Sequence, residues 1–154
     1  MTEVLKNTLP SQYTVFKGKS ALRMQLQKPE KIEEKYKTGC VFLQVAPLKE
    51  QKGETRIYNW EDKKISIKLG VNDISNIIYG FRYGEDVNLF HQFGGETKTI
   101  SITRNAERGG YFFAVQSKDE KGGGDKISVP ISSQETLAML LMFEAALPLI
   151  HNWL

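Results

Sequence analysis

The chain has 154 residues, of which 40% are hydrophobic and 25% are charged, and its formal net charge is +3. These values are typical of a globular protein with a sizeable core, and we expect a single domain over residues 1–154. No stretch approaches about 18 uninterrupted apolar residues, so we expect no membrane partner. One cysteine and two distant histidines do not make a zinc site, and we expect no metal and no cofactor. The small positive charge favours polyanionic partners without identifying one.

The first half of the chain is predicted to form four strands and a helix. β-Branched and aromatic residues alternate there with polar ones, which is typical of strands. Gly18 indicates a bulge or bend, and the mixed charges of Lys28 to Lys37 are typical of a solvated connection. The predicted strands are residues 13–27, 38–47 (ending at Pro47), 55–60 and 63–69, and the helix is residues 71–79, ending at Gly80.

The second half repeats this plan. Pro130 removes a backbone donor, so its strand is expected at a sheet edge or bulge. Ser132 and Glu135 have the spacing of a capping box and begin the last helix. The predicted strands are residues 86–93, 97–104, 111–117 and 126–131, with a flexible loop at 118–125.

Two segments align without a gap, and each is a strand followed by a helix. KISIKLGVNDISNIIYGF at residues 64–81 corresponds to KISVPISSQETLAMLLMF at residues 126–143. We therefore expect a duplicated unit, with one copy over about residues 12–81 and the other over about residues 86–153. Runs of antiparallel strands followed by a packing helix predict an α+β fold of two strand-strand-strand-strand-helix repeats.

The last helix is apolar almost all round, so it must be covered on every side. A protein of this size has little core to cover it, which predicts packing against another subunit. Pro148 is expected to kink this helix. The residues predicted to mediate oligomerisation are Leu137, Leu140, Leu141, Phe143 and Leu147.

No enzyme motif is present: we find no nucleophile elbow, phosphate-binding glycine loop or metal-ligand cluster, and we expect no catalysis. Instead, basic and aromatic side chains alternate on the predicted strands. Lysine and arginine neutralise phosphates, and exposed rings stack on unpaired bases. The same rings could equally fill a core, because period 2 does not say which face is exposed. The candidate nucleic-acid-binding residues are Phe16, Lys17, Lys19, Arg23, Arg56, Tyr58, Trp60, Phe90, Lys98 and Arg104.

Short motifs along nearly the whole chain resemble, in order, those of the Whirly family of single-stranded-DNA-binding proteins. The first, KGKSAL, resembles the family's KGKAAL with serine in place of one alanine. The others resemble LLLQFAP, YDW, EFFH, IPI and LPYLIGW of the family. In this chain they are KGKSAL at residues 17–22, VFLQVAP at 41–47, YNW at 58–60, NLFH at 88–91, VPI at 129–131 and LPLIHNW at 147–153.

The resemblance implies two crossed four-stranded antiparallel sheets with packed helices, assembled into a homo-oligomer, with a tetramer favoured over a dimer. It implies non-catalytic binding of single-stranded DNA with little sequence preference, in replication, recombination, repair or transcription. The family's KGK segment implies roles for Lys17 and Lys19 in binding and assembly. One alternative is an RNA-binding or strand-annealing protein of the same fold, and another is an interaction module that docks through its last helix. The loops at residues 28–37 and 118–125 differ from family loops, which favours a cytoplasmic bacterial or phage relative, or an organellar protein if a transit segment was removed.

Overall fold

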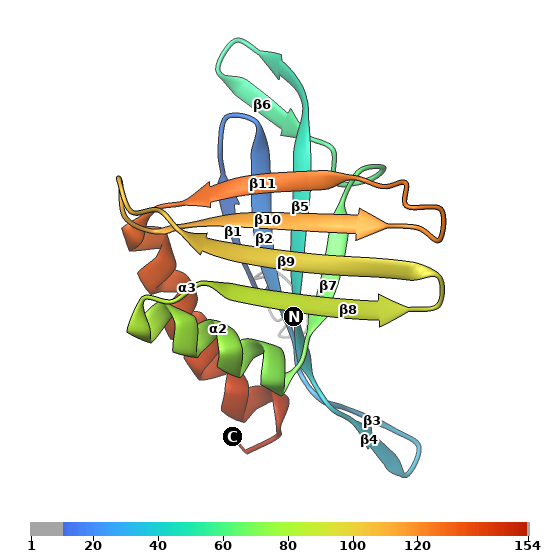
Figure 1. Cartoon of the computed structure of the whole chain (residues 1–154). Helices are drawn as coiled ribbons and strands as arrows, with labels where there is room; N and C mark the ends of the chain where they lie inside the picture. Colours follow the sequence, from blue (N-terminus) through green and yellow to red (C-terminus); the bar gives the residue numbers. More distant parts are fainter. Residues whose placement is uncertain (1–10, 154) are drawn as a thin grey trace, which may run out of the picture.

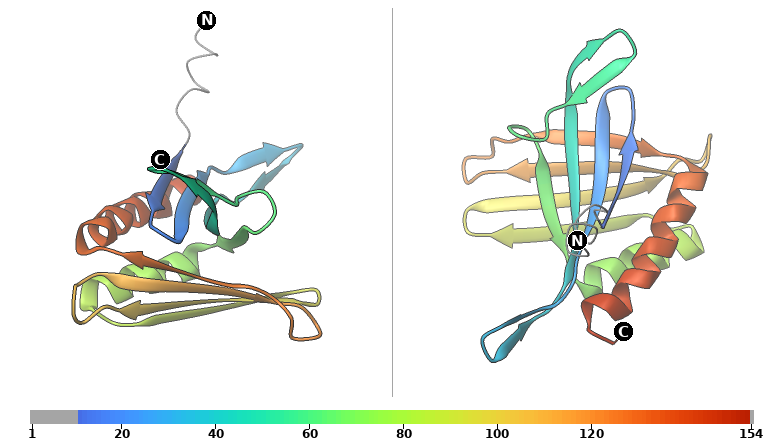
Figure 2. Two further views of the ribbon diagram at one scale, coloured as in Figure 1. Left: turned by 90° about the horizontal axis from the view of Figure 1, so that it is seen from above. Right: turned by 180° about the vertical axis from the view of Figure 1, so that it is seen from behind.

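The computed structural model describes residues 11–153 as two antiparallel sheets that cross one another, with two helices beside the crossing (Figure 1). The strands of the first sheet run across those of the second, and the view from above shows the sheets as two layers (Figure 2). The α+β fold predicted from the sequence is confirmed. The first sheet has five strands rather than the expected four, and a separate two-stranded hairpin accompanies it.

The first sheet is organised around the long strand β5. Its first half lies between β2 and β7, and its second half pairs with β6. The single strand predicted over residues 13–27 is wrong, because the chain reverses at Gly18 and Phe16 pairs with Ala21. Gly18 thus lies in a hairpin turn, so the predicted bend is confirmed and the bulge is not. The strands are β1 (Gln12–Phe16), β2 (Ser20–Gln27), β5 (Cys40–Lys52), β6 (Thr55–Tyr58) and β7 (Ile65–Leu69).

Strand β5 continues to Lys52, five residues beyond its predicted end at Pro47. Pro47 has no N–H to donate, but it is the last residue paired with β2, opposite Ser20. Beyond it the register shifts between Leu48 and Glu50, and β5 takes β6 as its new partner. The turn predicted after Pro47 is therefore part of a hairpin that projects from the sheet (Figure 1).

The segment predicted as a solvated connection forms a small hairpin, β3 (Glu30–Ile32) and β4 (Lys35–Lys37). Every residue of both strands is exposed, and Glu33 adopts a positive φ of 59° in the turn between them. This hairpin projects away from the body of the molecule (Figures 1 and 2). Its mixed charges are solvated, as expected, but the backbone is regular.

The second sheet has the strand order β11-β10-β9-β8. Its residues alternate between buried and exposed positions, because one face packs on the first sheet and the other faces outward. β11 lies at the edge, where Pro130 costs no ladder bond on its free side, and this prediction is confirmed. The strands are β8 (Val87–Phe93), β9 (Glu96–Arg104), β10 (Tyr111–Lys118) and β11 (Lys126–Ile131).

The helices are α2 (Val71–Tyr83) and α3 (Ser133–Ile150). The predicted end of α2 at Gly80 is wrong: the helix continues, and Gly84 ends it in the left-handed conformation with a φ of 65°. Gly80 is buried because Val87 packs directly against it and leaves no room for a Cβ atom. The two helices contact each other, and Arg82 Nε donates to Glu144 Oε1 over 2.8 Å.

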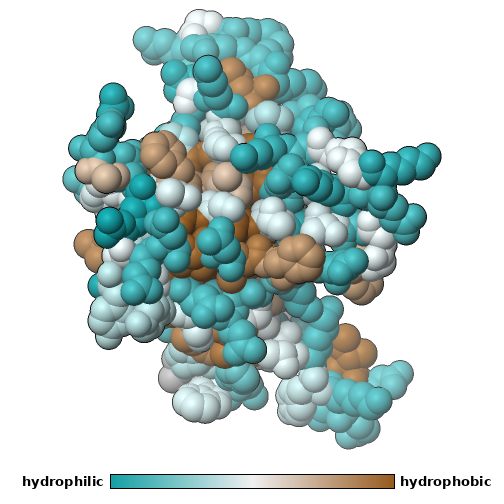
Figure 3. Space-filling view, viewed as in Figure 1, coloured by the Kyte–Doolittle hydropathy of each residue, from teal (hydrophilic) through white to brown (hydrophobic). Residues whose placement is uncertain are grey.

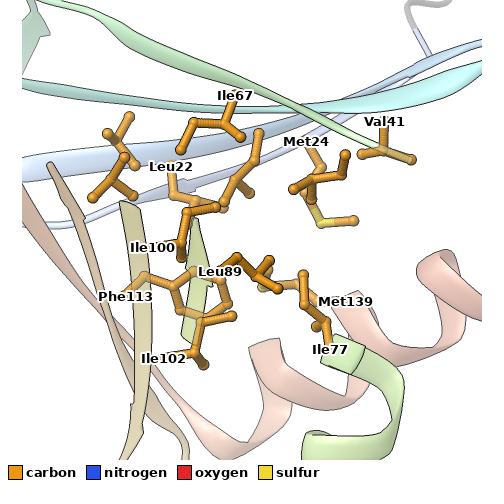
Figure 4. Close-up of a cluster of buried hydrophobic side chains, with 14 of the residues drawn as sticks. Leu22, Met24, Val41, Ile67, Ile77, Leu89, Ile100, Ile102, Phe113 and Met139 are labelled. Carbon is orange, nitrogen blue, oxygen red and sulfur yellow. The ribbon is translucent and has the colours of Figure 1, made fainter. Parts of the chain in front are cut away.

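One continuous core fills the space between the two sheets and the helices (Figure 4). Leu22 and Ile67 enter it from the first sheet, Phe113 from the second, Ile77 from α2 and Met139 from α3. The strand–helix units that align in the sequence contribute alike to it. Their corresponding core residues are Ile67 and Val129 in the strands, and Ile77 and Met139 in the helices.

Helix α3 is long and apolar enough, by length and composition alone, to cross a membrane. One side of it nevertheless packs into the core through Met139, Phe143 and Ile150. Its first turn carries a charged side chain, Glu135, in an ion pair with Lys17. These contacts are those of a packing helix in a two-sheet domain.

Candidate nucleic-acid interface

The KGK turn, residues 17–19, is held in place by bonds from other parts of the first sheet. Lys17 N donates to Ser20 O over 2.9 Å and closes the β1–β2 hairpin. Leu48 N donates to Lys19 O over 2.9 Å, and the Tyr58 hydroxyl donates to Lys17 O. Two of the family-like motifs, KGK and YNW, therefore form one structural unit.

Tyr58 was predicted to bind nucleic acid, and this is wrong for its ring. The side chain is only 9% exposed and packs in a small cluster with Ala21 and Ala46. A buried ring offers no face to a base. Phe16 lies against it with 5.6 Å between ring centroids, and Phe16 itself is 61% exposed. Tyr58 thus supports the exposed ring and the turn beside it.

Arg23 and Trp60 form a stacked pair on the outer face of the first sheet. The Arg23 guanidinium carbon lies 4.2 Å from the centroid of the Trp60 ring. Arg23 Nε donates to Gln44 Oε1 over 2.8 Å, and Gln44 Nε2 donates to Ser66 Oγ over 3.4 Å. The register places Arg23 opposite Gln44 and Gln44 opposite Ser66, so these side chains form a row across β2, β5 and β7.

The Arg23 guanidinium has no anionic partner. Partial burial lowers the pKa of Arg23, and none of the ion pairs among residues 11–153 involves it. A desolvated cation without a counterion binds an incoming anion more strongly than a solvated or paired one. The Trp60 ring and the Gln44 amide fix its orientation in advance. This arrangement is suited to a phosphate group, with the planar guanidinium and exposed rings nearby for bases.

Beside this row, the outer face opens into two connected depressions. A hollow of about 360 Å³ is lined by Gln25, Gln27, Phe42 and Gln44. A larger cleft of about 900 Å³ lies where β7 meets the β8–β9 hairpin, and both depressions share Phe42 and Ser66. The view from behind in Figure 2 shows the first sheet on this side of the molecule.

Of the candidates on the second sheet, Lys98 lines the larger cleft, whereas Phe90 and Arg104 do not. Phe90 is 65% exposed on the outer face of that sheet. This is the face seen in Figure 3, where hydrophobic side chains at the centre are surrounded by hydrophilic ones. Lys98 instead points inward, where Nζ donates to Ser66 O over 2.7 Å and joins the two sheets. Arg104 Nη1 donates to Gly84 O over 2.7 Å, at the C-terminal end of α2.

Apart from the buried Tyr58 and the exposed Phe90, the predicted residues fall into three groups. Phe16, Arg23 and Trp60 come together on the first sheet, next to the KGK turn. Arg56 is exposed on the projecting β5–β6 hairpin. Lys98 and Arg104 each donate to a backbone carbonyl within the chain, and Arg104 remains exposed, so their roles as phosphate contacts stay predictions.

Several residues of the outer face were missed by the sequence analysis. Gln44 is 8% exposed within the strongly apolar strand β5, and it organises the row. Its polar amide among VFLQVAP was the available signal, since it alternates with the core residues Leu43 and Val45. Other missed residues that line the hollow or the cleft include Gln25, Gln27, Phe42, Lys68 and Phe93, and the acidic residues Glu30, Asp73 and Glu96 lie among them.

The residues predicted for oligomerisation lie on different sides of α3. Leu137 and Leu141 are 56% and 57% exposed, and Leu140 and Leu147 are half-buried. Phe143 is fully buried in the core of its own chain, so its prediction as an oligomerisation contact is wrong. A helix of 18 residues has only one face toward the sheets, and Phe143 lies on it.

Residues 11–153 contain no group of three or more His, Cys, Asp or Glu side chains that could hold a metal ion. Cys40 is buried, and its burial raises the pKa of the thiol. His91 is not a ligand candidate either, because its Nε2 lies 2.9 Å from Asp73 Oδ2 at the start of α2.

Three plant proteins of known structure have the same fold. WHY1 of Arabidopsis thaliana matches with a TM-score of 0.79 and 24% identity, over 94% of this chain and 87% of that one. WHY3 of the same plant matches with a TM-score of 0.76 and 24% identity, over 92% of this chain and 89% of that one. The plant transcriptional regulator PBF-2 matches with a TM-score of 0.76 and 24% identity, over 95% of this chain and 85% of that one. At this identity the likeness establishes the fold, and none of these matches supports the expected bacterial or phage relative.

A comparison with curated protein sequences found no match. The family model described as "Whirly transcription factor" matches residues 15–142, which is most of the chain and includes the KGK turn, Arg23 and Trp60. The motifs, the crossed sheets and this match agree with one another. The chain belongs to the Whirly family of transcription factors.

Proposed function

We propose that this protein binds single-stranded DNA, with little sequence preference, across the outer face of its first sheet. The observation that carries this proposal is the Arg23 site: an unpaired, partly buried guanidinium stacked on Trp60 and oriented by Gln44. Phe16 and the KGK turn lie on the same hairpin. The site thus combines a fixed cation with exposed ring surface.

The chemistry of this face favours unpaired strands. A guanidinium neutralises one phosphate and releases its counterion. An exposed ring such as Phe16 stacks on a base with about 1–3 kcal/mol, whichever base it is. Glutamine amides can both donate and accept hydrogen bonds, so Gln25 and Gln27 tolerate different base edges. A duplex hides its base faces and leaves such rings without partners.

Family membership supports the coarser part of the proposal. Whirly proteins are non-catalytic nucleic-acid-binding regulators, and the chain is likewise not an enzyme. The PBF-2 structure is that of a plant transcriptional regulator. Action in replication, recombination or repair is a further proposal that rests on single-strand binding alone.

The direct test is a binding titration with a labelled oligothymidylate, a duplex of the same length and the corresponding RNA. We expect the single-stranded DNA to bind most tightly, with log K falling linearly against log salt concentration. Tighter binding of the duplex would refute the proposal. Tighter binding of the RNA would favour the RNA-binding alternative with the same fold.

A conservative substitution tests whether Arg23 carries the site. Arg23→Lys keeps the charge but loses the planar stack and the fork of donors. We expect the affinity for oligothymidylate to fall about five- to tenfold, which is the value of a partly buried cation–π contact. Arg108→Lys, on the exposed turn between β9 and β10, is the matched control and should not change it. Equal behaviour of the two variants would exclude the Arg23 site.

We also propose that the chain assembles into a homo-oligomer through α3, with a tetramer favoured. Leu137 and Leu141 are more than half exposed on this helix, and Met142, which follows Leu141, is exposed as well. Leu141→Glu should lower the mass measured in solution by light scattering while the circular dichroism spectrum stays that of the folded chain. An unchanged mass, or a monomeric wild type, would refute assembly through this face.

A further inference from the structure

The two lysines of the KGK turn lie on different sides of the first sheet. In β1 the odd-numbered residue Val15 faces the core, and Lys17 continues on that side toward α3. In β2 it is the even-numbered residue Leu22 that faces the core. Lys19 is exposed in the turn directly before β2, and the alternation of β2, continued by one residue, puts it on the side of the outward-facing Arg23. The same three-residue motif thus presents one lysine to each side.

Lys17 is bound by a carboxylate 118 residues away in the sequence. Its Nζ lies 2.7 Å from Glu135 Oε1, and both side chains are mostly buried, at 27% and 25% exposed. The same oxygen accepts the backbone N–H of Ser132 over 2.8 Å, and Ser132 Oγ accepts Glu135 N over 3.1 Å. Glu135 therefore caps α3 and holds Lys17 at the same time.

The ionised form of this carboxylate is stabilised. Partial burial raises the pKa of Glu135, but the hydrogen bonds from Lys17 and Ser132 outweigh it and lower the pKa overall. The Lys17 charge is thus balanced within the chain. Lys19 is exposed and takes part in none of the ion pairs found among residues 11–153. Of the two lysines of the turn, only Lys19 offers an uncompensated charge to a phosphate.

We propose that Lys17 and Glu135 form a strut that positions the KGK turn for nucleic acid, and that Lys19 alone of the two lysines contacts phosphate. This inference rests on the proposed binding of single-stranded DNA. The Tyr58 hydroxyl fixes the backbone of Lys17, and Glu135 fixes its side chain, so the turn is anchored to β6 and to α3. Glu135 thereby acts on the nucleic-acid site through Lys17 without touching the ligand.

The experiment measures the affinity for oligothymidylate as a function of salt, well below the unfolding temperature. Lys19→Met should reduce the slope of log K against log salt by about 0.7, the value for one phosphate contact with a single strand. Lys17→Met should leave the slope unchanged and lower the affinity about fivefold, because the turn loses its anchor. Glu135→Gln should also leave the slope unchanged and lower the affinity about fivefold. The Lys17→Met/Glu135→Gln double variant should bind no more weakly than either single variant.

Further variants separate positioning from general effects. Lys17→Arg can still reach the carboxylate and should restore most of the affinity. Lys121→Met, on the exposed loop between β10 and β11, is the control for loss of one positive charge and should change neither slope nor affinity. If Lys17 only stabilised the fold, Lys17→Met would have a lower unfolding temperature than the wild type but the same affinity for oligothymidylate.

The outcomes are distinct. A slope reduced by about 0.7 in Lys17→Met shows a direct phosphate contact and overturns the inference. Additive losses in the Lys17→Met/Glu135→Gln double variant, or unchanged affinity in both single variants, overturn it as well. If the wild-type protein does not bind oligothymidylate at all, the proposed function itself fails. If the wild-type protein binds oligothymidylate but the Lys17 and Glu135 variants do not give the expected slopes and affinities, the proposed function stands and the strut is rejected.

Discussion

The hydroxyl of Tyr58 joins two motifs that are 41 residues apart, and its removal tests whether this bond shapes the binding turn. Tyr58→Phe deletes one hydrogen bond to Lys17 O and keeps the ring that supports Phe16. A hydrogen bond of this kind contributes about 0.5–1.5 kcal/mol net. Lys17 is only half-buried, so water can partly replace the donor, and we expect a loss of about 1 kcal/mol. For a chain of this length that lowers Tm by about 2–4 °C.

The same variant should weaken binding of oligothymidylate by no more than about fivefold, because 1 kcal/mol is the most that the loosened turn can cost. Urea unfolding followed by circular dichroism and a fluorescence titration measure the two effects. Tyr36→Phe, on the exposed β3–β4 hairpin, is the matched control and should change neither. A loss of affinity far above fivefold with unchanged stability would mean that Tyr58 contacts the ligand, and the assignment of a supporting role would be wrong.

Three further predictions concern stability. Phe113→Ala empties the centre of the core, where this ring is fully buried, and should cost about 3–5 kcal/mol in urea unfolding. Gly110→Ala should cost about 1–3 kcal/mol by the same assay, because φ is 78° there and a Cβ atom would meet the backbone oxygen of Ile131. Burial raises the pKa of Glu135, but the bonds from Lys17 and Ser132 lower it overall, so its contribution to stability is present above its ordinary pKa of 4.5 and is lost as the pH falls through the folded value. The difference in free energy of unfolding between wild type and Glu135→Gln should therefore close on acidification below pH 4.5.

The sequence predicted the second sheet better than the first. Each strand from β8 to β11 exposes one face and buries the other, so alternation and turn glycines locate it. β5 has no such simple pattern, because its first half is covered on both sides by strands and its second half leaves the sheet. Proline usually ends a strand, but β5 continues past Pro47 because it exchanges β2 for β6 as its pairing partner. Partner changes depend on tertiary structure and leave no local signal.

The candidate site was predicted only in part, for a related reason. Period 2 places residues on faces but does not say which face is solvated. Tyr58 was a candidate because its strand is rich in basic and aromatic residues, yet it is covered by the KGK hairpin. Arg104 and Lys98 were chosen for their charge, but their partners are backbone carbonyls brought close only by folding. Likewise, nothing local to Lys17 reveals its pairing with Glu135.

The outer face of the first sheet combines features that stability alone does not favour. Burying a cation without a counterion and an amide in an apolar strand both cost free energy unless they are well bonded. Here the amide of Gln44 is bonded on both sides, and no side-chain nitrogen or oxygen that is fully buried among the described residues lacks a partner. The polar row is therefore complete except for the anion that Arg23 lacks. Positions where a fold departs from the simplest stable solution are most often functional. In the function proposed above, a phosphate group would supply the missing charge, and the preformed row would require little rearrangement to receive it.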